Sequence, residues 1–304
     1  MSQPKKYHGV IIPAVTPFTE YGKIDFSAAE KMMDFFVEAE TFPFILGTTG
    51  ESSSIKLEDK RDLVKTVSKR VNGRTTLYAG IADNCLESAV LAAKMFHDLG
   101  VDVFVAHAPY YYPLHEQHLH KYFVELADRL PAPLILYNIP ATTHLSLSLE
   151  LVKTLSQHPN IKGLKDSERS LERMRDLAAS FSKDPEFSLM SGWTVQSLFA
   201  LNLGFDGIVP STGNIVPKLF QKLYLAVQSG QGNAQELQEI INPIADIHQK
   251  DKILSQVIPA LKVMMNEHGL CSPEVIPPLL KSPERECQQI IAEMNRHQLD
   301  RYIS

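Results

Sequence analysis

The sequence predicts a (β/α)8 barrel (a TIM barrel) followed by a helical C-terminal region. Short runs rich in β-branched and aromatic residues alternate eight times with longer amphipathic stretches. The predicted strands are continuous apolar runs, which is typical of parallel strands that are covered on both faces. No change of composition interrupts the eight units, and this continuity favours one closed barrel over an open sheet.

Each predicted strand is followed by a predicted helix. In the first half of the chain, strands are expected at 8–15, 42–47, 75–80 and 102–107, and helices at 27–40, 57–71, 86–99 and 117–130. In the second half, strands are expected at 134–137, 161–165, 187–190 and 206–209, and helices at 148–157, 171–181, 195–203 and 216–228. Beyond residue 229 we expect helices alone, with breaks at Pro243 and around 269–278. The sequence therefore predicts a catalytic barrel at 1–228 and a helical region at 229–304.

The composition argues against several classes of function. The chain has 304 residues and a formal net charge of −5, and its basic residues are scattered. A mildly acidic chain has no electrostatic reason to bind nucleic acid. No segment reaches the ~20 apolar residues that cross a bilayer, so no membrane partner is expected. Cys85, Cys271 and Cys287 lack metal-site spacing and fit reduced thiols, which favours a cytoplasmic protein.

Lys165 is the most informative residue at a strand end. Active sites of (β/α)8 barrels lie at the carboxyl ends of the strands, and Lys165 ends the strand at 161–165. Its side chain should point into the barrel mouth, on the same face as Ile161 and Gly163. Burial lowers the pKa of a lysine, and the neutral amine is a nucleophile. A surface lysine that reaches into solvent is the alternative, and position alone leaves both interpretations open.

Tyr137 and the run GTTGE at 47–51 add to this interpretation. Tyr137 lies one strand–helix unit before Lys165, which places both side chains at the same height on adjacent strands. A phenol there can transfer protons, although a barrel-filling aromatic is the alternative. In the GTTGE run, backbone N–H groups and the hydroxyls of Thr48 and Thr49 can hold a carboxylate. An ordinary strand–helix turn is the alternative for this run.

Four motifs in this order and spacing resemble the dihydrodipicolinate synthase / N-acetylneuraminate lyase family of Schiff-base-forming class I aldolases. They are GTTGE at 47–51, YYYP at 110–113, YNIP at 137–140 and KDS at 165–167. The resemblance covers residues 8–228, and a helical tail is usual in the family. It implies a homotetramer, a dimer of dimers, that uses no metal and no cofactor beyond the lysine imine formed with its substrate.

The resemblance implies a role for each matching residue. Lys165 matches the lysine that forms the Schiff base, and Tyr137 matches the tyrosine that relays protons. Thr48 and Thr49 match the pair that binds the keto-acid carboxylate and supports that relay. Tyr111 matches the tyrosine that, in the synthases, reaches into a neighbouring subunit's site.

Positions near the second substrate depart from both enzymes that name the family. The synthases usually carry an arginine two residues after the proline of the YNxP motif, where this chain has Thr142, and a hydroxyl cannot replace a bidentate guanidinium. Sialic acid lyases usually have an acidic pair after the seventh strand, where this chain has SGWT with Trp193. Val209 matches an aliphatic residue of the pyruvate pocket, and Ser211 matches a hydroxyl near the second substrate. Uncharged groups are thus expected at the rim, namely Thr142, Thr143, Ser167, Thr194 and Ser211.

We interpret the chain as a pyruvate-dependent class I aldolase or lyase that acts on a small 2-keto acid and an aldehyde. The uncharged rim favours a hydroxylated substrate of the keto-deoxy sugar acid type. A dihydrodipicolinate synthase, which joins pyruvate to aspartate semialdehyde, and a keto-deoxy sugar acid dehydratase are alternatives. From another class, a non-catalytic barrel that binds a keto or sugar acid is a further alternative, disfavoured because a binder needs no amine.

A histidine cluster offers a metal site as a rival interpretation. His115, His118 and His120 lie close in sequence to Glu116, and two of the histidines can share a helix face. They begin a predicted helix after Pro113, where solvated polar residues are normal, and the HExxH spacing is absent. No metal is therefore expected.

Overall fold

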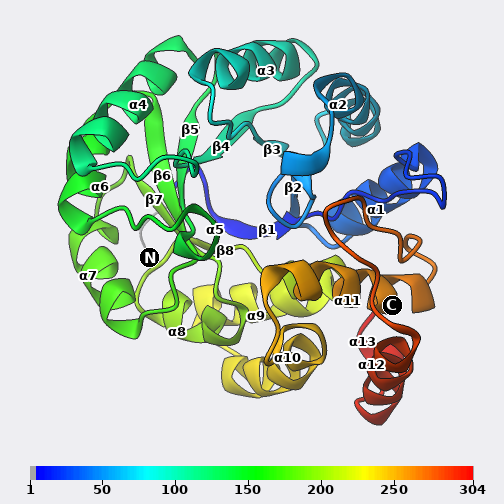
Figure 1. The fold of residues 1–304 in the computed structure, drawn as a ribbon. Coiled ribbons are helices and arrows are strands. Elements are labelled where there is room, and N and C mark those ends of the chain that lie inside the picture. The colour runs from blue at the N-terminus through cyan, green and yellow to red at the C-terminus, as the bar shows by residue number, and fades with distance from the viewer. Residues whose placement is uncertain (1–4, 304) are drawn as a thin grey trace.

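Eight parallel strands form a closed barrel in chain order. The computed structural model describes residues 5–303, and β8 pairs with β1 to close the sheet. Figure 1 looks into this barrel, with helices around it. The predicted (β/α)8 fold is confirmed. The strands are β1 Gly9–Pro13, β2 Phe42–Ile45, β3 Tyr78–Gly80, β4 Val103–His107, β5 Leu134–Asn138, β6 Ile161–Asp166, β7 Ser188–Ser191 and β8 Gly207–Ile208.

Helices follow the strands and cover the outside of the barrel. They are α1 Phe26–Glu38, α2 Leu57–Val71, α3 Leu86–Asp98, α4 Glu116–Arg129, α6 Leu149–Leu155, α7 Leu171–Phe181, α8 Ser197–Asn202 and α9 Pro217–Ser229. Short helical turns that the periodicity did not predict occupy loops after strand ends: η1 Ser52–Ser54, α5 Pro140–Thr143, η2 Thr194–Gln196 and η3 Ser211–Asn214. The helix expected at 195–203 is therefore divided between η2 and α8.

The C-terminal region is helical, as predicted. Its helices are α10 Ala234–Gln249, α11 Leu254–Glu267, α12 Glu284–Arg296 and α13 Asp300–Ile303, and Figure 1 shows them gathered on one side of the barrel beside α9. The expected break at Pro243 is wrong, because α10 continues through it. Proline removes one helical hydrogen bond, but α10 buries Ile241, Ile244 and Ala245 on this side of the molecule. The break expected around 269–278 is confirmed between α11 and α12.

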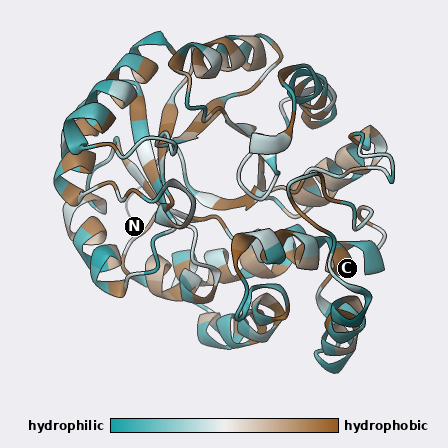
Figure 2. Cartoon of the chain, viewed as in Figure 1, coloured by the Kyte–Doolittle hydropathy of each residue, from teal (hydrophilic) through white to brown (hydrophobic). Residues whose placement is uncertain are grey.

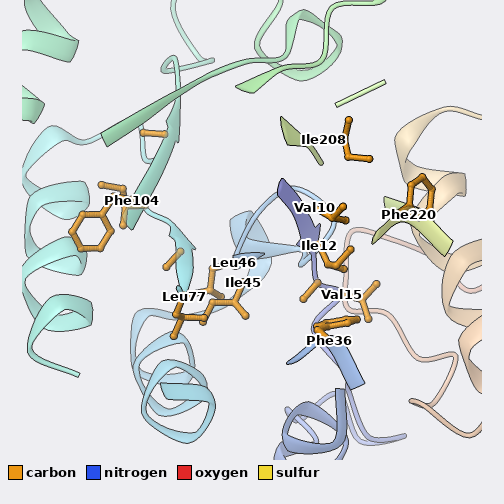
Figure 3. Packing of buried hydrophobic residues seen from close by; sticks show 14 of the residues in the cluster. Val10, Ile12, Val15, Phe36, Ile45, Leu46, Leu77, Phe104, Ile208 and Phe220 are labelled. Atoms are coloured by element: carbon orange, nitrogen blue, oxygen red, sulfur yellow. The ribbon is translucent and has the colours of Figure 1, made fainter. Parts of the chain in front are cut away.

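Apolar side chains form two layers of core. Val10 and Ile12 of β1 point outward and pack among helices, as Figure 3 shows with Phe36 of α1 and Phe220 of α9. A second, smaller cluster fills the barrel itself, with Ile11 among its members. Figure 2 shows brown strands inside and teal on the helices around them. Strands that bury both faces read as continuous apolar runs, which is the pattern that predicted the barrel.

An irregularity in β6 corrects one expectation about side-chain direction. Ile161 pairs with Leu134, but Gly163 pairs with Ile135, so β6 carries one extra residue at this point. Ile161 consequently packs in the outer layer with Leu134, while Ile135 belongs to the barrel interior. The expectation that Ile161 shares a face with Lys165 is wrong, because such an insertion reverses the alternation of faces.

None of the helices described between residues 5 and 303 is long and apolar enough to cross a membrane.

Candidate active site

Three neighbouring strands end in a row of inward-facing side chains. His107 of β4 is the register partner of Tyr137 in β5, and Tyr137 is the register partner of Lys165 in β6. Tyr137 belongs to the cluster inside the barrel. Register partners in a sheet point to the same face, so all three side chains converge on the carboxyl-terminal mouth of the barrel.

Lys165 is a buried amine held between two aromatic rings. Its residue is 5% exposed, and Nζ lies 3.8 Å from the ring centroid of Tyr137 and 4.9 Å from that of Phe44. Burial lowers the pKa of Lys165, and this effect outweighs the opposing influence of Tyr137. A lowered pKa increases the fraction of neutral amine near pH 7. The geometry therefore favours a nucleophilic amine over a lysine that reaches into solvent.

A polar network behind the row fixes the ends of β5 and β6. Asn138 Nδ2 donates to Asp166 Oδ2 (2.9 Å) and to Glu168 Oε2 (2.9 Å), and Arg173 Nε donates to Asp166 Oδ2 (2.8 Å). Ser146 Oγ also donates to Glu168 Oε2 (2.6 Å). Burial raises the pKa of Asp166 against the lowering effect of Arg173. These bonds tie together the residues that directly follow Tyr137 and Lys165 in the chain, so they restrain where those two side chains lie.

The loop after β2 contains backbone donors that have no acceptor among the described residues. Gly50 N donates to Gly47 O (3.1 Å), and Thr16 Oγ1 donates to Gly50 O (2.7 Å), which fixes the turn. Within residues 5–303, the N–H groups of Thr48 and Thr49 donate to no protein acceptor. Adjacent backbone N–H groups without a protein acceptor are able to bind an anion such as a carboxylate.

A buried ion pair joins this loop to the C-terminal region. Glu51, in a left-handed backbone conformation, accepts a hydrogen bond from Lys262 Nζ of α11 at 2.6 Å. Both side chains are almost completely buried. Ile276 N donates to the other carboxylate oxygen (3.0 Å), and Lys262 Nζ also donates to Glu274 O (2.7 Å). Each charge is therefore paired and further hydrogen-bonded, which is what burial of an ion pair requires.

A cavity of about 280 Å3 lies over the row. Its wall includes Thr48 of the β2 loop, and Tyr137 and Thr142 at and after the end of β5. The C-terminal region also contributes to the cavity wall, with Leu254, Ser255, Ile258, Pro278 and Leu279. No arginine or lysine from the described part of the chain is among the lining residues. The cavity is thus lined mostly by apolar and uncharged polar groups.

The structure brings together some of the predicted site residues. Tyr137, Thr48 and Thr142 line the cavity. Lys165 lies against Tyr137, and Val209 is buried in the same interior cluster.

Other predicted residues lie outside this cavity wall. Thr49 and Ser167 are partly buried. Trp193 packs against the outer core. Ser211 Oγ accepts a hydrogen bond from Gln249 Nε2 at 3.1 Å. Tyr111, in the β4–α4 loop, is 73% exposed and is not among the residues that line the cavity.

Sequence reasoning gave no role to His107 or Lys262. His107 lies at a predicted strand end, one strand–helix unit before Tyr137, and this spacing was a usable sequence signal. Lys262 lies far along the chain in a helix without a motif, so no sequence signal linked it to Glu51. No sequence signal identified the residues of the C-terminal region that line the cavity either.

The histidine cluster has a structural role at the start of α4. His115 N donates to Nδ1 of His118 at 3.1 Å, so one ring caps the first turn. Between residues 5 and 303, no group of three His, Cys, Asp or Glu side chains is arranged to hold a metal ion.

A (β/α)8 barrel with a buried amine at its carboxyl-terminal mouth has the arrangement that a barrel enzyme with a lysine nucleophile requires. The sequence profile of the Dihydrodipicolinate synthetase family matches residues 6–296, and the chain belongs to this family. The chain is 32% identical over 293 residues to a 4-hydroxy-tetrahydrodipicolinate synthase of Gluconobacter oxydans, covering 96% of each protein. It is 30% identical over 289 residues to the same enzyme of Staphylococcus haemolyticus, covering 95% of this chain and 96% of that one.

Solved structures agree with this assignment. The chain resembles YagE from E. coli K12, a prophage protein of the dihydrodipicolinic acid synthase family in complex with pyruvate. The TM-score is 0.89 at 26% identity, over 97% of this chain and 99% of that one. Dihydrodipicolinate synthase from Bacteroides thetaiotaomicron gives the same TM-score and the same identity, over 97% of this chain and 100% of that one. The protein is therefore an aldolase-type lyase of this family.

Proposed function

We propose that Lys165 forms a Schiff base with a 2-keto acid such as pyruvate, and that the protein makes or breaks a carbon–carbon bond to a hydroxylated, uncharged aldehyde. The buried amine of Lys165 at the barrel mouth carries this proposal. Burial of an amine without an ion-pair partner costs free energy. A nucleophile needs the neutral amine that burial favours, whereas a protein that only binds does not.

The proposed reaction depends on the ability of a protonated imine to accept the electron pair of a breaking carbon–carbon bond. In the cleavage direction, Lys165 Nζ attacks the keto carbon, and loss of water gives an iminium. The hydroxyl at C4 then loses its proton, the C3–C4 bond breaks, and its electron pair moves into the iminium to give an enamine and a free aldehyde. Protonation of C3 and hydrolysis release pyruvate and the amine. The synthetic direction reverses each step.

Tyr137 and the β2 loop have complementary roles in this proposal. The Tyr137 phenol transfers protons at the carbinolamine and at the C4 hydroxyl, since its ring lies against the amine. The N–H groups and hydroxyls of Thr48 and Thr49 hold the keto-acid carboxylate, and Thr48 supports the proton relay. Val209 supplies an apolar wall beside the keto acid.

The absence of arginine and lysine from the described cavity lining supports a neutral second substrate. A second carboxylate needs a cationic partner when it is removed from water, and none of these lining residues is a cation. Thr142 lies in the cavity wall and offers a hydroxyl. Ser167, Trp193 and Ser211 lie outside this wall and are proposed as contacts only for a substrate with a longer polyol chain.

A second candidate function is that of 4-hydroxy-tetrahydrodipicolinate synthase. The names of the relatives from Gluconobacter oxydans and Staphylococcus haemolyticus favour it. It requires the site to hold aspartate semialdehyde, which carries a carboxylate.

We also propose that Tyr111 completes the site of a neighbouring copy in a homotetramer. Its exposed ring packs edge-on against that of Tyr112, with 5.0 Å between centroids, and both project from the barrel. Tyr111→Ala should lower turnover without preventing imine formation. Sedimentation equilibrium gives the oligomeric state, and a monomer with full activity would contradict this role.

Reductive trapping tests the central proposal. Incubation with pyruvate and borohydride should add one reduced pyruvyl group to Lys165, as peptide mass spectrometry can locate. Lys165→Met is the matched control and should take up no label. Labelling elsewhere, or an unlabelled Lys165 under conditions that trap a known aldolase, would refute the Schiff-base mechanism. A chelator should leave turnover unchanged.

A further inference from the structure

His107 is the one member of the inward-facing row that the proposed mechanism leaves without a role. It is the last residue of β4, directly after Ala106, it is half-buried, and it lines the cavity. Its ring centroid lies 6.2 Å from that of Tyr137 and 6.1 Å from that of Tyr110. His107 therefore stands beside the reacting centre, on the side away from Lys165.

The contacts of His107 define which nitrogen carries its proton. Nδ1 lies 2.8 Å from the carbonyl oxygen of Ala108, and a carbonyl accepts, so Nδ1 is the donor. Burial lowers the pKa of His107, against the raising effect of the hydrogen bond to Ala108 and with a further lowering by Lys165, so the surroundings favour the neutral ring. In this tautomer Nε2 has a lone pair and no proton.

Two other polar side chains of the cavity wall are less suited than His107 to accept a hydrogen bond. Thr142 Oγ1 donates to Ile139 O at 3.3 Å, so its proton is engaged, and its oxygen is a weaker acceptor than an imidazole nitrogen. Glu51 reaches the cavity wall, but Lys262 and Ile276 occupy both of its oxygens. An imidazole lone pair accepts from a hydroxyl and repels a carboxylate.

We propose that His107 is a specificity-determining residue whose Nε2 accepts a hydrogen bond from a hydroxyl on the aldehyde part of the substrate. The proposal rests on the proposed aldol reaction and extends it, because it assigns the recognition of a hydroxyl to one atom. The substrate class is an uncharged 2- or 3-hydroxyaldehyde, or the 2-keto acid formed from it.

Two substitutions separate the two nitrogens of the ring. His107→Asn keeps an amide near the Nδ1 position, where it can donate to Ala108 O, but has no atom at the Nε2 position. His107→Gln extends by one carbon and restores a polar group near that position. The two variants differ by one methylene group, so each is a control for the other.

The experiment measures kcat/KM for the addition of pyruvate to glyceraldehyde and to propanal, which have the same carbon chain but differ in hydroxyl groups. The wild type should prefer glyceraldehyde. His107→Asn should lower kcat/KM for glyceraldehyde by about tenfold to a hundredfold and change that for propanal by less than about threefold, because one accepted hydrogen bond is lost. His107→Gln should recover part of the preference.

Different outcomes would overturn different parts of this scheme. Equal losses with both aldehydes would make His107 a structural residue, and unchanged kinetics would remove any role. If a variant fails to fold, the wild type still decides, because equal kcat/KM for the two aldehydes contradicts recognition of the hydroxyl. Borohydride trapping with pyruvate is run in parallel. A wild type that forms no imine refutes the proposed function. If the wild type is trapped but the His107 variants keep its preference between the two aldehydes, only the role of His107 is refuted.

Discussion

At the scale of single residues, burial determines the reactivity of Lys165. The amine is desolvated between Phe44 and Tyr137, and its pKa lies below the ordinary lysine value of 10.5. Imine formation needs the neutral amine, so the trapping rate should rise with pH and level off at the lowered pKa. The measurement is the initial rate of pyruvate-dependent labelling across pH 6–11. A rate that still rises through pH 10.5 would indicate an exposed, ordinary lysine.

Replacing Lys165 should separate activity from stability. Lys165→Met removes a buried polar amine and keeps most of the side-chain volume, so turnover should disappear while the free energy of unfolding stays equal or increases. Denaturant unfolding of both proteins provides the comparison. A loss of more than about 2 kcal/mol would show that the amine stabilises the fold, against the desolvation argument.

Tyr137 is expected to act on proton transfer and not on binding. Tyr137→Phe keeps the ring against Lys165 and removes the phenol, so kcat should fall by roughly 10²–10⁴-fold while imine trapping persists. Single-turnover kinetics with pyruvate distinguish the two steps. Near-normal turnover would reduce Tyr137 to a packing residue.

Much of the reacting centre could be predicted from the sequence, because strand-end position and spacing carry it. One strand–helix unit separates Tyr137 from Lys165, and the register confirms that they are neighbours. His107 lies one strand–helix unit before Tyr137, but its proposed role as a hydrogen-bond acceptor depends on its tautomer. The hydrogen bond between Nδ1 and the carbonyl of Ala108 determines that tautomer. Sequence does not contain that contact.

At the scale of elements, the Glu51–Lys262 pair connects the β2 loop to α11 across the molecule. Lys262→Met leaves the Glu51 carboxylate buried without its partner, which should cost about 3–5 kcal/mol of unfolding free energy. Lys281 provides the control, because it pairs with Glu274 but is largely exposed. Lys281→Met should cost less than about 1 kcal/mol. Similar losses for the two variants, measured by urea denaturation, would contradict the importance of burial.

Element positions were predictable where periodicity was strong, and local exceptions were not. The helix at 57–71 and the helix at 171–181 were predicted with the bounds of α2 and α7. Pro243 was expected to end a helix, yet tertiary packing of α10 overrides its local preference. The extra residue in β6 was also invisible, because pairing with β5 defines a bulge and an isolated strand has no partner.

At the scale of the whole molecule, the C-terminal helices belong to the site. The division into a catalytic barrel and a helical region stays a prediction, but Leu254 and Ile258 of α11 line the cavity beside Tyr137. The outer core also continues from Val10 of the barrel to Ile241 of α10. The cavity wall is therefore built from segments that lie far apart in the sequence, and strand-end motifs alone could not define it.

The cavity as a whole predicts the choice of aldehyde. A carboxylate transferred from water into a cavity without a cation lacks a charge-assisted hydrogen bond, which should cost a few kcal/mol in the transition state. Since ~1.4 kcal/mol corresponds to a factor of ten, kcat/KM for aspartate semialdehyde should lie about two orders of magnitude or more below that for glyceraldehyde. Both values are measured side by side with pyruvate on the purified protein.

Thr142 provides the matched variant for this comparison. Thr142 lines the cavity, so Thr142→Arg would bring a guanidinium to the wall and should raise kcat/KM for aspartate semialdehyde while lowering that for glyceraldehyde. Thr142→Ser keeps the hydroxyl and should leave the preference unchanged. If the wild type instead prefers aspartate semialdehyde, a cation from outside the described wall must serve it. The protein would then share the activity for which its Gluconobacter oxydans and Staphylococcus haemolyticus relatives are named.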